Sequence, residues 1–186
     1  MDTAKGAVED FTTALTWIKD NGNTIADSIK LIDRLRCMGV HGSAKLTNAI
    51  AKSCNVYFAE LGRRLGIDLL DFWARKFGIG VKTGIEIGES SGILAGPEHS
   101  EKVGAKWYES GSSQAAIGQS DNMFTPVQLA TYVATIANGG NRYKTHLVKK
   151  ITDYNRSNII KEFGAELVES TGVSEENLQA VKNGMR

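Results

Sequence analysis

The sequence predicts a mainly α-helical protein with a small antiparallel β element. Three observations support this: apolar residues recur at helical spacing, one segment opens with a Thr-Pro-x-Gln helix start, and two β-prone runs flank a short polar turn. The chain has 186 residues, 41% hydrophobic and 23% charged, which is ordinary globular usage. Its length fits one domain, or one domain with a small lobe.

The helices expected before residue 80 follow from apolar stripes. Residues 11–18 have the i, i+3, i+4, i+7 spacing of an amphipathic helix, and a second helix is expected after residue 25. Residues 46–65 are again helical in pattern, with an interruption at residues 53–55 because serine and asparagine favour caps and turns. A short helix is expected over residues 69–77.

The clearest helix start lies at Thr125. Thr125, Pro126 and Gln128 supply an N-cap, a first-turn proline and the partner of a capping box. Asn138-Gly139-Gly140 supplies a left-handed stop. The stripe expected to form the buried face of this helix consists of Val127, Ala130, Val133, Ala134 and Ala137.

The last part of the chain changes pattern. Residues 146–152 and 158–163 are β-prone and flank Asp153-Tyr154-Asn155-Arg156, which predicts a hairpin. Ser174 is the expected N-cap of a final helix, in which two glutamates suit the positive end of the helix dipole.

Charge and cysteine usage exclude several classes of function. The 22 basic and 21 acidic residues give a net charge of +1, so no nucleic-acid partner is expected. No apolar run approaches the ~20 residues that cross a bilayer, and no signal segment is recognised, so we expect this chain to be soluble, without anchor or signal.

Cys37 and Cys54 have no Cys-x-x-Cys partner and are expected to be ordinary thiols. His41, His99 and His146 lie far apart, so the sequence predicts no bound metal and no cofactor.

Ser53-Cys54-Asn55 is a Ser-x-Asn triplet, a weak signal of serine acyl transfer when it stands alone. It lies within Ala49-Ile50-Ala51-Lys52-Ser53-Cys54-Asn55-Val56-Tyr57-Phe58, a string that resembles the transpeptidase domain of penicillin-binding proteins, most closely the class B, elongation or division type. The resemblance covers roughly residues 37–150, in the family's order and spacing. It continues through Phe77-Gly78-Ile79-Gly80, Thr83-Gly84-Ile85, Ile117-Gly118-Gln119, Thr125-Pro126-Val127-Gln128-Leu129-Ala130 and Ile136-Ala137-Asn138-Gly139-Gly140.

The resemblance implies roles for the matching residues. Ser53 would relay protons between the region of the nucleophile and the leaving amine, and Asn55 would hydrogen-bond the substrate amide. Both groups can do so in a small cleft without the desolvation cost of a charge. The alternative is a helix-breaking turn in which both side chains only cap backbone groups. Gln119 would line the edge of the cleft or cap a loop, and His41 would hold the approach to the turn.

Two other family motifs do not match. Lys82-Thr83-Gly84 follows a Phe-Gly-Ile-Gly block, where the family commonly has a turn without catalytic duty, so the functional Lys-Thr-Gly is expected beyond Arg186. Aligning the first helix with the one that carries the family's nucleophile places Ala7 at the serine position and Asp10 at the lysine position. An alanine cannot attack a carbonyl, and an aspartate cannot replace the activating amine.

The function implied by the resemblance is that of a fragment of a D,D-transpeptidase, which crosslinks peptidoglycan by acyl transfer from D-Ala-D-Ala stem peptides through an acyl-serine intermediate. This chain alone is expected to be inactive. The alternative is a non-catalytic relative that serves as a binding or scaffolding module of the cell envelope. A β-lactam-hydrolysing or sensing relative is disfavoured, because the blocks after Phe77 resemble transpeptidases.

The resemblance also implies an architecture and a location. Residues 1–145 would form the helical lobe with the Ser-x-Asn motif, and residues 146–186 a hairpin and a helix truncated before the third motif, within the α/β fold shared with serine β-lactamases. We expect an exposed apolar patch that a homodimer could cover. Stem peptides and β-lactams would be the ligands, and family members act outside the cytoplasmic membrane.

Overall fold

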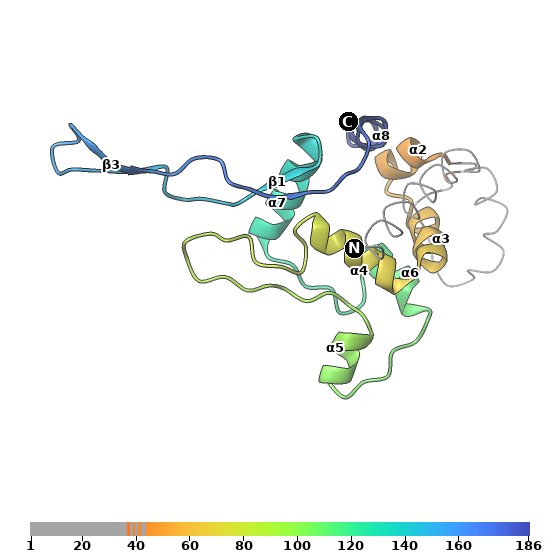
Figure 1. The fold of residues 1–186 in the computed structure, drawn as a ribbon. Helices are drawn as coiled ribbons and strands as arrows, with labels where there is room; N and C mark the ends of the chain where they lie inside the picture. The colour runs from red at the N-terminus through yellow and green to blue at the C-terminus, as the bar shows by residue number, and fades with distance from the viewer. Residues whose placement is uncertain (1–36, 38, 40, 42–43) are drawn as a thin grey trace. The chain divides into compact units, whose positions relative to one another are not determined.

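The computed structural model describes Cys37, Gly39, His41 and residues 44–186. The helices expected over residues 11–18 and after residue 25 lie outside the described residues, as do Ala7 and Asp10. The described part is mostly helical with two small antiparallel sheets (Figure 1), which confirms the predicted fold class. It contains no helix with the length and apolar character of a membrane span.

The chain divides into two compact units. The first comprises the described residues up to 73 together with residues 93–122 and 172–186, and the second comprises residues 74–92 and 123–171. These units group segments that are distant in sequence. The division at residue 145 expected above concerns motif content and stays a prediction.

The first unit consists of helices. They are α2 (Leu46–Ala51), α3 (Asn55–Leu65), most of α4 (Ile67–Lys76), α5 (Pro97–Lys102), α6 (Gly111–Ala116) and α8 (Glu175–Gly184). The interruption predicted at residues 53–55 is found at residues 52–54, between α2 and α3, and Asn55 already belongs to α3. Ser174 caps α8 by accepting a hydrogen bond from the Asn177 N–H. The short helices α5 and α6 were not predicted.

Two glycines set the packing that supports the turn between α2 and α3. Gly62 brings α3 against α6 so closely that a Cβ on Gly62 would lie 2.7 Å from the Ser112 carbonyl oxygen. Gly184 brings α8 against α2, where a Cβ would lie 3.0 Å from the Thr47 carbonyl oxygen. Neither position has room for a side chain, so α3 packs closely against α6, and α2 packs closely against α8. These two contacts fix the helices before and after the turn.

The second unit joins α7 (Pro126–Ala137) to the strands β1 (Asn141–Tyr143), β2 (Lys150–Thr152), β3 (Ile159–Glu162) and β4 (Leu167–Ser170). β1 pairs with β4 and β2 with β3, both antiparallel. The β2–β3 pair is the predicted hairpin, which extends away from α7 and β1 in Figure 1. All four residues of β3 are exposed.

The capping box predicted at α7 is confirmed, but its predicted buried face is wrong. Thr125 and Gln128 cap each other, and the Gln128 amide also donates to the Val81 and Ser91 carbonyl oxygens at 2.7 Å each. The buried side chains are Gln128, Thr131, Thr135 and Ile136. The expected apolar stripe is largely exposed, with Val133 44% accessible. The hydroxyls of Thr131 and Thr135 satisfy helix carbonyls, which makes their burial inexpensive.

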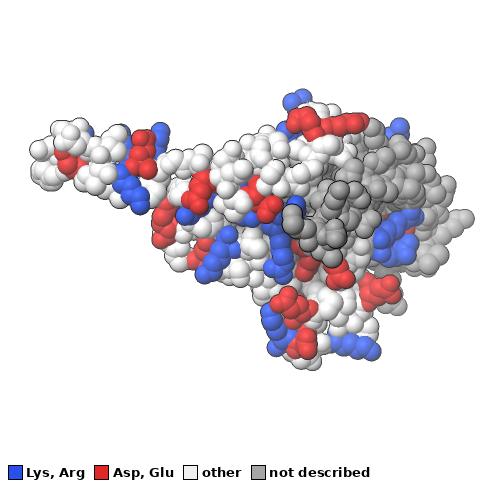
Figure 2. Space-filling model, in the orientation of Figure 1, with Lys and Arg blue, Asp and Glu red and all other residues white. Residues whose placement is uncertain are grey.

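Acidic and basic side chains are interspersed on the surface. Figure 2 shows both signs on the hairpin and on α5, where Lys102 pairs with Glu98 at 2.7 Å. Such exposed pairs contribute little to stability.

Candidate functional site

The segment Ser53-Cys54-Asn55 is a tight reversal between α2 and α3. The Cys54 N–H donates to the Ala49 carbonyl at 2.9 Å, and the Ser53 N–H donates to the Ile50 carbonyl at 3.0 Å. This pair of bonds is the Schellman motif, which closes a helix with one residue in the left-handed region. Ser53 occupies that position with φ of 48°, where glycine is usual and another residue costs about 1 kcal/mol. Such a strained residue suggests a functional constraint.

Within the part of the chain that the structure describes, the polar side chains of this turn have no structural partner. Ser53 is exposed, and Asn55 is half-buried as the first residue of α3. The N-terminus of α3 has no side-chain cap, and neither side chain hydrogen-bonds to another described residue. Both the substrate roles and the alternative, in which the two side chains merely cap backbone groups, are therefore untested. Their catalytic roles stay predictions.

A small buried cluster fixes the backbone beneath these side chains. It consists of Ala44, Ala49, Cys54 and Tyr57, with Cys37 and Leu46 among the partly buried residues packed against it. Cys54 follows the αL residue of the Schellman motif and packs with Ala49, as the corresponding residue commonly does. Because Cys54 is anchored, its two neighbours in the triplet are held in place.

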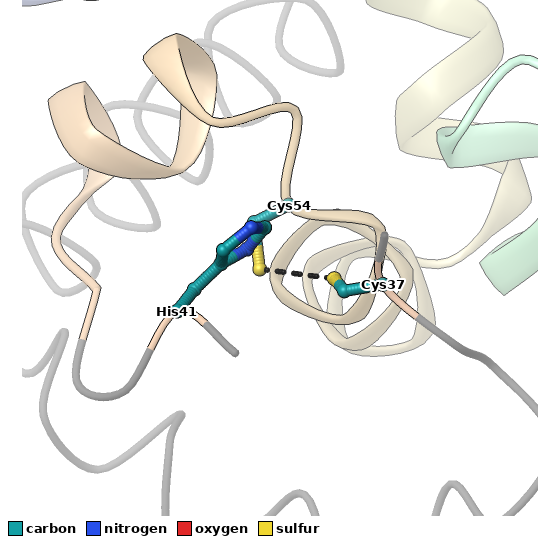
Figure 3. A group of neighbouring side chains, drawn as sticks. All are labelled: Cys37, His41 and Cys54. Atoms are coloured by element: carbon teal, nitrogen blue, oxygen red, sulfur yellow. Dashed lines mark hydrogen bonds between the residues drawn. The ribbon is translucent and has the colours of Figure 1, made fainter. Parts of the chain in front are cut away.

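Cys37, His41 and Cys54 converge at this turn, which the sequence analysis did not predict. Their ligand atoms all lie within 4.8 Å of one another, and Figure 3 shows the His41 ring beside the two sulfur atoms. The Cys37 and Cys54 sulfurs are 3.5 Å apart, and the Val56 N–H donates to the Cys37 sulfur at 3.5 Å. The linear spacing of these cysteines and histidines gives no sign of this cluster, because the fold joins residues that are distant in sequence.

Burial controls the electrostatics of this cluster. Desolvation is the main cause that raises the pKa of the Cys54 thiol, and the Cys37 thiol adds to the rise, while the backbone N–H groups of Tyr57 and Val56 oppose it. Burial, with the nearby Cys54, raises the pKa of Tyr57 to about 12. The Nδ1 atom of His41 is buried and finds no hydrogen-bond partner among the described residues. Buried polar atoms are usually paired, so an unpaired nitrogen here needs an explanation.

The donor set of the cluster fits a zinc ion. Thiolate and imidazole are the ligands that zinc prefers, and zinc–sulfur bonds of about 2.3 Å in a tetrahedron place two sulfurs about 3.8 Å apart. The observed separation of 3.5 Å is close to that value. The three side chains would leave one tetrahedral position for a fourth ligand.

Gln119 lies after α6 and is exposed. Its N–H donates to the Gln114 carbonyl at 2.9 Å, and its carbonyl accepts a hydrogen bond from the Asn122 amide at 3.1 Å. Both bonds use the backbone of Gln119 and close a loop, and within the described residues no hydrogen bond joins the Gln119 side chain to Ser53 or Asn55. Its role at a cleft edge stays a prediction.

Lys82-Thr83-Gly84, the segment predicted as a turn, is irregular and belongs to none of the helices or strands described for residues 44–186. Its lack of a catalytic duty stays a prediction. The Glu89 carboxylate accepts hydrogen bonds from the Thr83 N–H at 2.9 Å, the Thr83 hydroxyl at 2.8 Å and the Gly84 N–H at 2.8 Å. Burial alone would raise the pKa of Glu89, but these bonds bring it below its usual range. Thr83 is 4% accessible, so its polar groups serve the turn itself.

Comparison with known proteins identifies the family. The model of the penicillin-binding protein transpeptidase domain matches residues 6–186. The chain is 36% identical over 111 residues to the peptidoglycan D,D-transpeptidase MrdA of Acinetobacter baumannii, an alignment that covers 59% of this chain and 16% of that protein. It is 37% identical over 123 residues to the stage V sporulation protein D of Bacillus subtilis, covering 64% and 18%. The chain thus spans about a sixth of the length of these relatives.

Solved structures agree with this family. The penicillin-binding protein A of Mycobacterium tuberculosis, solved as its ceftriaxone acyl-enzyme complex, superposes with a TM-score of 0.63 at 28% identity, over 79% of this chain and 31% of that one. A chain of a peptidoglycan synthase complex that coordinates polymerization and crosslinking superposes with a TM-score of 0.68 at 28% identity, over 81% and 25%. This chain belongs to the penicillin-binding protein transpeptidase family, and its helices and small sheets are part of that family's α/β fold.

Proposed function

We propose that this chain is part of a D,D-transpeptidase that crosslinks peptidoglycan by acyl transfer from D-Ala-D-Ala stem peptides, with Ser53 and Asn55 facing the substrate. The observation that carries the proposal is the strained turn, on which a hydroxyl and a carboxamide have no described structural partner. The match of the family model to residues 6–186, which include this turn, supports a stem peptide as the substrate.

The chemistry of the two groups suits these roles. A serine hydroxyl both donates and accepts a hydrogen bond, so Ser53 can pass a proton to a leaving amine. A carboxamide can donate to one atom of a peptide unit and accept from another, so Asn55 can orient a stem-peptide amide. The Schellman bonds and the packing of Cys54 limit the motion of both groups, which reduces the entropy lost on binding.

A nuclear magnetic resonance titration tests these roles on the purified chain. We expect D-Ala-D-Ala dipeptide to shift the amide signals of Ser53 and Asn55, and we expect Asn55→Ala to reduce that response. L-Ala-L-Ala is the matched control ligand and should shift these signals less. Equal shifts with both dipeptides, or shifts confined to other segments, would contradict the assignment of the turn as a substrate site.

We propose further that the chain itself forms no acyl-enzyme, because Ala7 and Asp10 stand where the nucleophile and its activating lysine are expected. Intact-mass spectrometry after incubation with a fluorescent penicillin tests this, with peptide mapping of any adduct. We expect no adduct. A stoichiometric adduct on one serine would show that the first motif is misaligned and that the chain can be acylated.

The family relation also supports a place of action and an association. We propose that the parent protein acts at the outer face of the cytoplasmic membrane and binds β-lactams, as the acyl-enzyme neighbour does.

The exposed face of α7, with Leu129 46% and Val133 44% accessible, is the apolar patch that a second copy would cover. Light scattering that shows only monomer at high concentration would contradict dimerisation.

We propose that Cys37, His41 and Cys54 bind a zinc ion, because the distances and donor types fit one. Titration with cobalt(II), a spectroscopic substitute, should give thiolate-to-metal absorption that zinc displaces. Cys37→Ser should remove part of that absorption, whereas the matched variant His99→Ala should not change it. Absorption that is independent of Cys37 would exclude it as a ligand.

A further inference from the structure

The pair formed by Cys37 and Cys54 is arranged for chemistry that needs no metal. Their sulfurs are 3.5 Å apart although the residues are separated by 17 positions. A disulfide bond is about 2.05 Å long, so the sulfurs would have to approach by about 1.5 Å. Figure 3 shows the two sulfur atoms facing each other. Rotation of the side chains with a small backbone shift can bring the sulfurs to bonding distance.

The two thiols differ in access, which assigns them different roles. Cys37 is half-buried, whereas Cys54 is 6% accessible. The more accessible sulfur can meet an external disulfide, and the Val56 N–H donates to the Cys37 sulfur at 3.5 Å, which holds this sulfur in place beside Cys54. The buried sulfur lies next to it and can complete the exchange. This division corresponds to an attacking and a resolving cysteine.

We propose that Cys37 and Cys54 are a modification site for thiol–disulfide exchange, at which a disulfide donor converts the pair to an intramolecular bridge. The Cys37 thiolate attacks one sulfur of the donor and forms a mixed disulfide, releasing one donor thiol. The Cys54 sulfur then attacks the Cys37 sulfur and releases the second donor thiol. The pair loses two electrons and two protons in total, and the donor disulfide gains both.

The bridge has a direct consequence for the candidate site. Cys54 is the middle residue of the Ser53–Asn55 turn, and it ends the Schellman motif of α2 and precedes α3. A bond to Cys37 would close a loop across 17 positions and restrict this turn. Because disulfides persist in oxidising compartments and are reduced in the cytosol, the rigidity of the turn would depend on the compartment. This inference does not depend on the proposed acyl transfer. Zinc binding would use the same two sulfurs, so the bridge forms only in the metal-free chain.

The test uses the purified chain with oxidised glutathione as donor and a chelator to exclude metal. Free thiols are blocked under denaturing conditions, and the products are resolved by intact mass and non-reducing peptide mapping. We expect a Cys37–Cys54 peptide link, with an exchange equilibrium constant at least about 10-fold larger in the folded chain than in urea. Cys37→Ser is the matched variant and should form no internal bridge.

Two results would overturn the proposal. One is glutathione attached separately to each cysteine without an internal bridge. The other is a bridge that forms equally well in urea, since the fold would then contribute nothing to it. Amide hydrogen exchange at Ser53 and Asn55 provides the second readout. It should slow in the bridged chain, and unchanged exchange would refute the effect on the turn.

Discussion

The turn at Ser53–Asn55 and the turn at Lys82–Gly84 both carry short sequences that resemble catalytic motifs, but their polar groups are used differently. Ser53 is strained and exposed, and its side chain has no described partner. Thr83 is buried, and its amide and hydroxyl both donate to Glu89. A polar group that already has its partner stabilises the fold, whereas one without a partner can serve a ligand.

This comparison predicts that removing the Glu89 charge has the largest effect on stability. Glu89→Gln turns a carboxylate with three donors into an amide that presents N–H groups to some of them. We expect the free energy of unfolding to fall by about 2 kcal/mol, as is typical when hydrogen bonds to a charged group are lost. Urea denaturation measures it. Glu98→Gln, which removes an exposed pair, is the control and should change it by less than about 0.5 kcal/mol.

The same carboxylate gives the Lys82–Gly84 turn a dependence on pH. The folded-state pKa of Glu89 is lowered, so its contribution is fully present above the unfolded-state pKa and is lost as pH falls through the folded-state value. We expect the stability difference between the wild-type chain and Glu89→Gln to be constant at neutral pH and to shrink in acid. Urea denaturation at several pH values measures this difference. A gap that is constant down to strongly acidic pH would refute the role of the charge.

The local signals in the sequence explain why much of the fold could be predicted. The Thr125 capping box, the turn at Asp153 and the Ser174 cap each involve residues close in sequence, so the pattern contains the interaction. The short helices α5 and α6 lack a long apolar stripe and were missed.

The errors arose where tertiary contacts decide. The buried face of α7 was assigned to its apolar stripe, but Gln128 is fully buried because its amide bridges two carbonyls of residues 81 and 91. The thiol–imidazole cluster was missed for the same reason, because the turn before α3 brings Cys54 to Cys37 and His41. In contrast, the Ser-x-Asn triplet was found because its three residues are consecutive.

A glycine at position 53 should produce a smaller effect of opposite sign. Ser53→Gly relieves the left-handed strain, so we expect the free energy of unfolding to rise by about 1 kcal/mol, together with a loss of any substrate response of the turn. Ser113→Gly within α6 is the matched control and should lower it by about 0.5 kcal/mol. Thermal and urea denaturation measure both. A loss of stability in Ser53→Gly would mean that its hydroxyl supports the fold.

Asn55→Ala should have the smallest effect on stability. Because the Asn55 side chain makes no described hydrogen bond, its removal should change the free energy of unfolding by less than about 0.5 kcal/mol. The matched change Thr83→Val removes a hydroxyl that donates to a charged carboxylate and should cost about 1.5 kcal/mol. Urea denaturation compares the two variants. Equal losses of unfolding free energy in the two variants would mean that both turns are structural. If the Asn55→Ala chain is stable but no longer responds to D-Ala-D-Ala, then Asn55 is a binding group and Thr83 a structural one.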